Sequence, residues 1–108
     1  MDRMYEKFRT SQQPAVKLDI ALDEGFREGA REEYGQYLRL RGRPAAEELI
    51  RREDTEKLEA MAKNGWFPGS QIDTLLGFAA EQRKNEAMLW LLQWKKENRG
   101  FDRRDFSL

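Results

Sequence analysis

Few residues in this sequence could carry out chemistry, because its 108 residues include no His and no Cys. Their absence excludes imidazole bases, thiolate nucleophiles, disulfides and the commonest zinc and haem ligands. Carboxylates remain, but Glu32 beside Glu33, and Glu47 beside Glu48, would point about 100° apart on a helix, which is poor geometry for a shared acid and base. We therefore expect no catalytic residue, no metal site and no cofactor, and we expect that the protein is not an enzyme.

Arginine is concentrated between residues 39 and 52, where five Arg against two Glu give a local net charge of +3. The five are Arg39, Arg41, Arg43, Arg51 and Arg52. Such a surface could contact phosphate or an acidic protein, and a nucleic-acid-associated protein is our alternative function. Residues 17–33 have a net charge of −3, so the two stretches could instead pair with each other, or both could be solvated helix faces. The zero net charge of the chain favours neither nucleic acid nor a membrane as partner.

Aromatic residues form the other candidate group. In the last expected helix the apolar side chains cover about 200° of the circumference, whereas one packing contact needs only about 100°. The surplus could be covered by an N-terminal helix or by Phe101 and Phe106. Otherwise it predicts an exposed aromatic patch for another protein. The residues expected to bind that partner are Trp66, Phe67, Trp90 and Trp94.

Helices are expected to position all of these residues. The composition, with 37% charged residues, 39% hydrophobic residues and three Pro, is typical of one all-α domain over residues 1–108. Apolar residues recur every fourth position from Leu18 to Leu38, which predicts a long helix within 14–43. Residues 1–13 could be a flexible arm or one docked helical turn, and 101–108 are expected to be a tail. The five expected helices lie near 15–41, 45–52, 55–64, 71–83 and 86–98.

Residues 44–100 are expected to form two helical hairpins that repeat each other. A shift of 30 residues aligns Thr55 with Asn85 and aligns the apolar positions that follow. The alternative is that any two amphipathic hairpins with short loops would align in this way. The expected centre of the core consists of Leu76, Ala80, Met88, Leu91 and Leu92.

The second hairpin resembles an ankyrin repeat. The matching residues are Thr74, Leu76, Ala79 and Ala80 for the first helix, and Glu86, Met88, Leu91 and Leu92 for the second. The pattern departs from the family at Leu75, Gly77 and Arg83, where the family has Pro, His and a turn-forming Gly. Ankyrin repeats are interaction modules, so the resemblance implies stacked hairpins that bind protein.

The sequence therefore predicts a protein–protein interaction or assembly module, such as an adaptor or an inhibitor of a larger protein. Its partner would be another protein or a second copy, because two repeats are fewer than stacked arrays usually need. The N-terminal residues lack the apolar stretch of a secretory signal, and no run is long enough to cross a membrane. We expect a cytoplasmic protein.

Overall fold

The computed structural model describes residues 2–66 and 69–106, with side chains described as far as Glu97 in the last helix. Within these residues it contains seven α-helices, one short 3-10 helix and no strand, which confirms the all-α class. The elements are α1 (Arg3–Thr10), α2 (Pro14–Glu24), α3 (Glu32–Leu40), α4 (Gly42–Arg52), α5 (Thr55–Lys63), η1 (Gly69–Gln71), α6 (Ile72–Glu81) and α7 (Asn85–Phe106).

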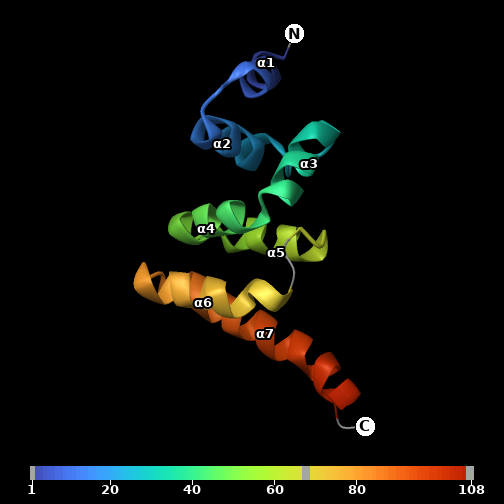
Figure 1. Ribbon diagram of the computed structural model, residues 1–108, viewed down its shortest axis with the longest axis vertical. Coiled ribbons are helices and arrows are strands. Elements are labelled where there is room, and N and C mark those ends of the chain that lie inside the picture. Colours follow the sequence, from blue (N-terminus) through green and yellow to red (C-terminus); the bar gives the residue numbers. More distant parts are fainter. Residues whose placement is uncertain (1, 67–68, 107–108) are drawn as a thin grey trace.

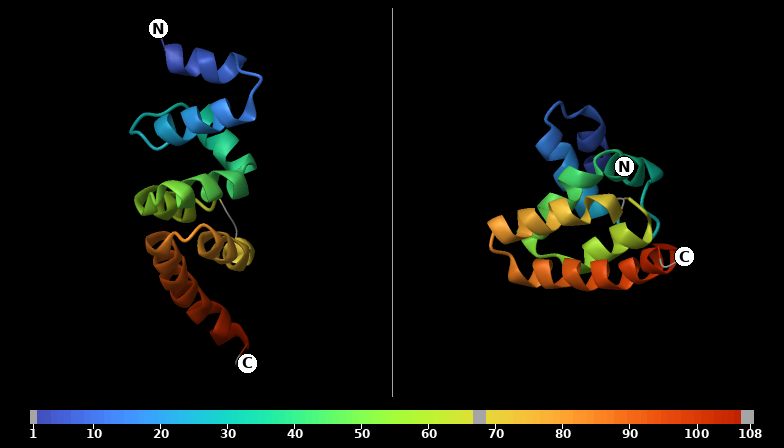
Figure 2. Two further views of the ribbon diagram at one scale, coloured as in Figure 1. Left: turned by 90° about the vertical axis from the view of Figure 1, so that its left-hand side faces the viewer. Right: turned by 60° about the horizontal axis from the view of Figure 1, so that its bottom comes forward.

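The helices form an elongated stack of 54 × 30 × 22 Å, which runs from α1 at one end to α6 and α7 at the other (Figure 1). Helix α1 packs on α2, and α2 pairs with α3. Below them lie the hairpins α4–α5 and α6–α7, in which α4 packs against α6 and α5 against α7 (Figure 2). Each hairpin is therefore one layer of the stack.

The single long helix expected within 14–43 is wrong, because the chain reverses between α2 and α3. At Gly25, an added Cβ would lie 3.0 Å from Leu38 Cδ1 and 3.2 Å from Tyr34 Cβ, so only glycine lets α3 approach so closely. Gly29 then adopts a φ of +76°, in the left-handed region that favours glycine. The apolar repeat continues through this break because both helices bury their apolar faces against each other.

The N-terminal residues form a docked helix, which is the second of the two expectations for residues 1–13. Asp2 caps α1, since its carboxylate accepts a hydrogen bond of 3.0 Å from the Tyr5 N–H. Phe8 is buried and meets the rings of Tyr34 and Tyr37 edge to face, with ring centroids 5.0 Å and 5.3 Å away. Helix α1 therefore covers this end of the stack.

The expected core is wrong by one residue along α6 and α7, except at Leu91, which is fully buried. The buried residues of these two helices are Ile72, Leu75, Ala79, Ala87 and Leu91. Leu76 and Met88 are half-buried, whereas Ala80 and Leu92 are exposed. The reason is that α4 and α5 cover only one side of this hairpin, and that side carries Leu75 and Ala79.

The last helix is longer than expected, because its backbone stays helical through Gly100 to Phe106. One glycine in a helix costs only about 1 kcal/mol, which the surrounding turns can offset. Most of the expected tail is therefore helical. The predicted covering role of Phe101 and Phe106 concerns side chains outside the described part.

The two hairpin turns have the same backbone geometry, 30 residues apart. Glu53 and Arg83 adopt φ values of 53° and 57°, in the left-handed region. In each turn that residue donates its N–H to the carbonyl three residues back, and the next residue donates to the carbonyl five residues back. This is a left-handed helix ending that usually carries glycine. The Glu53 carboxylate also accepts a hydrogen bond of 3.1 Å from the Glu86 N–H, and so joins the first turn to the start of α7.

Candidate functional site

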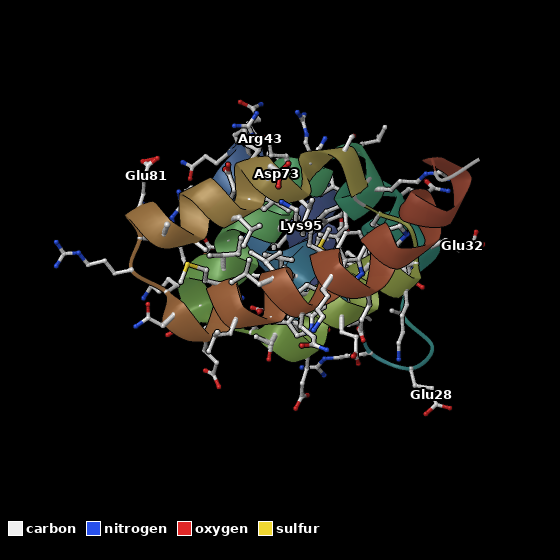
Figure 3. The ribbon with its side chains drawn as sticks, turned by 90° about the horizontal axis from the view of Figure 1, so that it is seen from below. Glu28, Glu32, Arg43, Asp73, Glu81 and Lys95 are labelled. Atoms are coloured by element: carbon white, nitrogen blue, oxygen red, sulfur yellow. The ribbon has the colours of Figure 1, made fainter. Side chains whose placement is uncertain are left out.

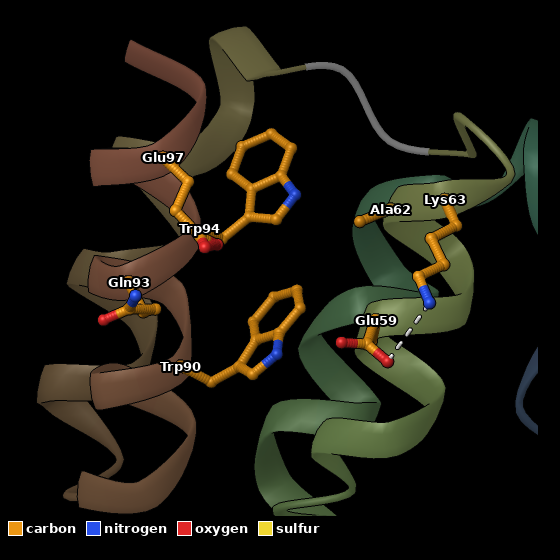
Figure 4. A pocket seen from close by; sticks show the side chains of 7 residues that line it. All are labelled: Glu59, Ala62, Lys63, Trp90, Gln93, Trp94 and Glu97. Carbon is orange, nitrogen blue, oxygen red and sulfur yellow. Dashed lines mark ion pairs between the residues drawn. The ribbon is translucent and has the colours of Figure 1, made fainter. Parts of the chain in front are cut away.

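A groove between α5 and α7 brings together two of the predicted partner-binding residues (Figure 4). Its volume is about 350 Å³. We call it the aromatic groove, and its lining consists of Glu59, Ala62, Lys63, Trp90, Gln93, Trp94 and Glu97.

Trp90 and Trp94 form one wall of the aromatic groove. They lie one helical turn apart on α7, and Figure 4 shows both indoles pointing toward α5. Both are half-buried and pack against the core. Gly69 in η1 lies beside the second indole, since a Cβ at Gly69 would be 3.5 Å from Trp94 Cη2. The indoles are thus held by their own helix and by the 3-10 turn while part of their surface stays accessible.

Charged side chains line the opposite wall and one end of the aromatic groove. Lys63 Nζ lies 3.6 Å from a Glu59 carboxylate oxygen, and both side chains are largely exposed (Figure 4). Glu97 adds a second carboxylate from α7. The lining therefore has two carboxylates for one ammonium group. Indole faces attract cations, so this combination suits a side chain with an apolar stem and a positive end.

Trp66 does not join the other two Trp residues. Its ring centroid is 5.6 Å from that of Phe26, and an added Cβ at Gly35 would lie 3.2 Å from Trp66 Cζ2. It therefore packs against the α2–α3 layer, and it does not line the aromatic groove. Phe67, the fourth predicted partner-binding residue, lies outside the described residues.

The arginines of residues 39–52 mostly contact groups within the chain. Arg52 donates to Asp19 at 3.0 Å, and to Asp23 and Glu48 at 3.1 Å each, so it links α4 to the acidic face of α2. Burial by itself would lower the pKa of Arg52, but the hydrogen bonds to Glu48 and Asp23 outweigh it and raise that pKa. Internal pairing, one of the three interpretations of the two charged stretches, is what the structure shows at Arg52.

The other arginines of this group are more exposed. Arg43 pairs with Glu47 at 3.3 Å, and Arg51 pairs with Glu48 at 3.1 Å. The Arg41 guanidinium lies 5.8 Å from the centre of the Tyr37 ring, and Arg39 is exposed on α3. Surface pairs of this kind contribute little individually. The group does not form one surface of free cations in the described part of the chain.

The outer side of the α6–α7 hairpin is a second apolar surface, and we call it the open end. It consists of Leu76, Ala80, Met88 and Leu92, with Leu89 at its edge. Leu89 is 64% exposed and Leu92 is 45% exposed, values that are high for leucine. Viewed from this side, Asp73 of α6 and Lys95 of α7 lie between the two helices, where they form an ion pair (Figure 3).

Sequence reasoning placed four of these residues in the core and did not select Leu89 as a site residue. The repeat itself was the signal that could have found the open end, because a terminal repeat has no neighbour on one side. Among the described residues, no helix is both long and apolar enough to cross a membrane, and no group of three or more acidic side chains could hold a metal ion.

Comparison with protein-family models, with curated proteins and with solved structures finds no match to this chain.

Proposed function

We propose that this chain is a non-enzymatic protein–protein interaction module that holds a segment of a partner in the aromatic groove. The observation that carries this proposal is the pair of accessible indoles, one turn apart, in a groove of about 350 Å³. Tryptophan is enriched among the residues that dominate binding energies, since a large apolar ring becomes buried with little loss of conformational entropy.

The arrangement of the hairpins supports the same function. Stacked hairpins offer long surfaces built from adjacent layers, and the aromatic groove lies where α5 of one layer meets α7 of the next. We propose that the two hairpins are a degenerate ankyrin-like pair, supported by the identical turn geometry at Glu53 and Arg83. Arg83 holds the left-handed conformation where the family has glycine. A cytoplasmic location is part of this proposal.

The chemistry of the groove favours a partner segment with a basic side chain. The aliphatic stem of an Arg or Lys would lie on Trp90 and Trp94, while its charge would be near Glu59 and Glu97. An acidic segment would meet the same two carboxylates and be repelled.

The test is affinity capture from an extract of the native cell, followed by titration with the purified partner. We expect Trp94→Ala to weaken binding at least about tenfold, as truncation of a central aromatic contact does. Leu89→Ala, on the opposite side of the same helix, is the matched control and should bind like the wild type.

Glu97→Lys tests the charge preference without removing an indole. Glu97 is exposed, so this variant should stay folded, and we expect it to weaken binding of a basic segment. Partners that bind equally well to Trp90→Ala, Trp94→Ala and Glu97→Lys, with folding checked by circular dichroism, would contradict the proposed function.

A further inference from the structure

The open end corresponds to a surface that is an internal interface one layer earlier. A shift of 30 residues places its residues on the α4–α5 hairpin, where Leu76 corresponds to Ala46, Ala80 to Ile50, and Met88 to Leu58. Those three residues of α4 and α5 are fully buried. Leu92 corresponds to Ala62, which lines the side of α5 that faces α7. The open end therefore has the pattern of a layer interface without a covering layer.

The opposite end of the molecule cannot supply that layer. The outer surface of α1 is polar, with Arg3, Glu6, Lys7 and Arg9 exposed and Met4 as its one partly exposed large apolar side chain. Head-to-tail stacking would bury these charges against leucines, which is unfavourable. An apolar surface on one end alone is matched best by the same surface of a second molecule.

The charges around the open end are compatible with this pairing. Asp73 and Lys95 neutralise each other across the two helices, and Glu81 and Lys96 are exposed on α6 and α7. The chain has zero formal net charge, so two copies do not repel each other strongly.

We propose that two copies of this chain associate through their open ends, with α6–α7 of one packed on α6–α7 of the other about a twofold axis. The two stacks would then form one longer stack with a polar α1 at each outer end. This inference does not depend on the aromatic groove, because Trp90 and Trp94 face α5 and the open end faces away from it.

Analytical ultracentrifugation of the full chain tests the association. We expect the wild type to change from monomer to dimer with concentration, and Leu92→Glu to raise the dissociation constant at least about a hundredfold, because it places an unpaired charge in the interface. Leu40→Glu is the matched control: Leu40 is 83% exposed on α3, so the substitution should leave the dimer unchanged.

Disulfide cross-linking tests the geometry, and the absence of native cysteine makes it specific. Under mild oxidation Ala80→Cys should give a covalent dimer, and Leu40→Cys should not. A wild type that stays monomeric at every concentration would overturn the proposal. So would a dimer that Leu92→Glu leaves intact, or one that cross-links through Leu40 and not through Ala80. None of these results would affect binding of a partner in the aromatic groove, which is measured separately.

Discussion

The N-terminal end of the stack is closed by a helix, whereas the C-terminal end exposes a hairpin whose outer side is apolar. At the closed end, Phe8 is inserted between the rings of α3 and an ion pair joins Arg31 to Asp2. At the other end, Leu89 and Leu92 are exposed. Both ends are built from amphipathic helices, and they differ in whether one more element lies on the outside.

This difference shows what α1 contributes. It is only eight residues long, and isolated helices of that length are marginal in water. Its order therefore depends on Phe8 and on the tether through Asp2. A short amphipathic segment is enough to turn an apolar end of a helical stack into a polar one.

The largest effect is expected inside the α6–α7 hairpin, where one residue separates core from open end. Leu91→Ala should lower the free energy of unfolding by about 2 to 5 kcal/mol, because the side chain is fully buried. Leu92→Ala should cost less than about 1 kcal/mol at concentrations where the protein is monomeric. Urea denaturation followed by tryptophan fluorescence measures both, and equal losses would show that Leu92 belongs to the core.

Opening the closed end should have the next largest effect. Phe8→Ala is expected to cost about 2 kcal/mol, below the usual loss for a buried Phe, because α1 can undock alone and so limits the loss. Its amides should lose protection from hydrogen exchange while those of α4 and α6 keep theirs. Unchanged protection in α1 would mean that Phe8 does not hold the helix.

A smaller gain is expected at the turn of the α6–α7 hairpin. Arg83→Gly should raise stability by about 0.5 to 1 kcal/mol, because glycine adopts the left-handed conformation without a steric cost. The matched change Glu53→Gly should help less, since it also removes the acceptor for the Glu86 N–H. Thermal unfolding compares the two, and a larger gain at Glu53 would mean that this hydrogen bond contributes nothing.

The smallest effect concerns pH at the closed end. The hydrogen bond from the Tyr5 N–H, together with the Arg31 side chain, lowers the pKa of Asp2 below its usual 3.8. A lowered folded-state pKa stabilises the docked helix above pH 3.8, and this contribution is lost as the pH falls through the folded-state value. Hydrogen exchange of α1 should therefore accelerate in acid. Asp2→Asn keeps a capping side chain without the ionisable group, so the same acceleration in that variant would assign it to another residue.

Much of this architecture could be predicted from local sequence. The absence of strands in the described residues, the hairpin turns near 53 and 83 and the start of α7 at Asn85 all follow from spacing and capping residues. The break at Gly25 was harder to predict, because the apolar repeat continues across it. Its cause is the approach of Leu38 and Tyr34, which lie far along the chain.

By itself, the sequence determined the helical class, the absence of His and Cys chemistry, and the presence of more apolar surface on the last helix than one contact needs. Only the tertiary structure decided which of two adjacent apolar positions is covered: Leu75 rather than Leu76, and Leu91 rather than Leu92. The physical reason is that neighbouring apolar residues make both helix faces almost equally hydrophobic, so local periodicity does not distinguish them. The position of the α4–α5 layer makes one face the core and leaves the other as the open end.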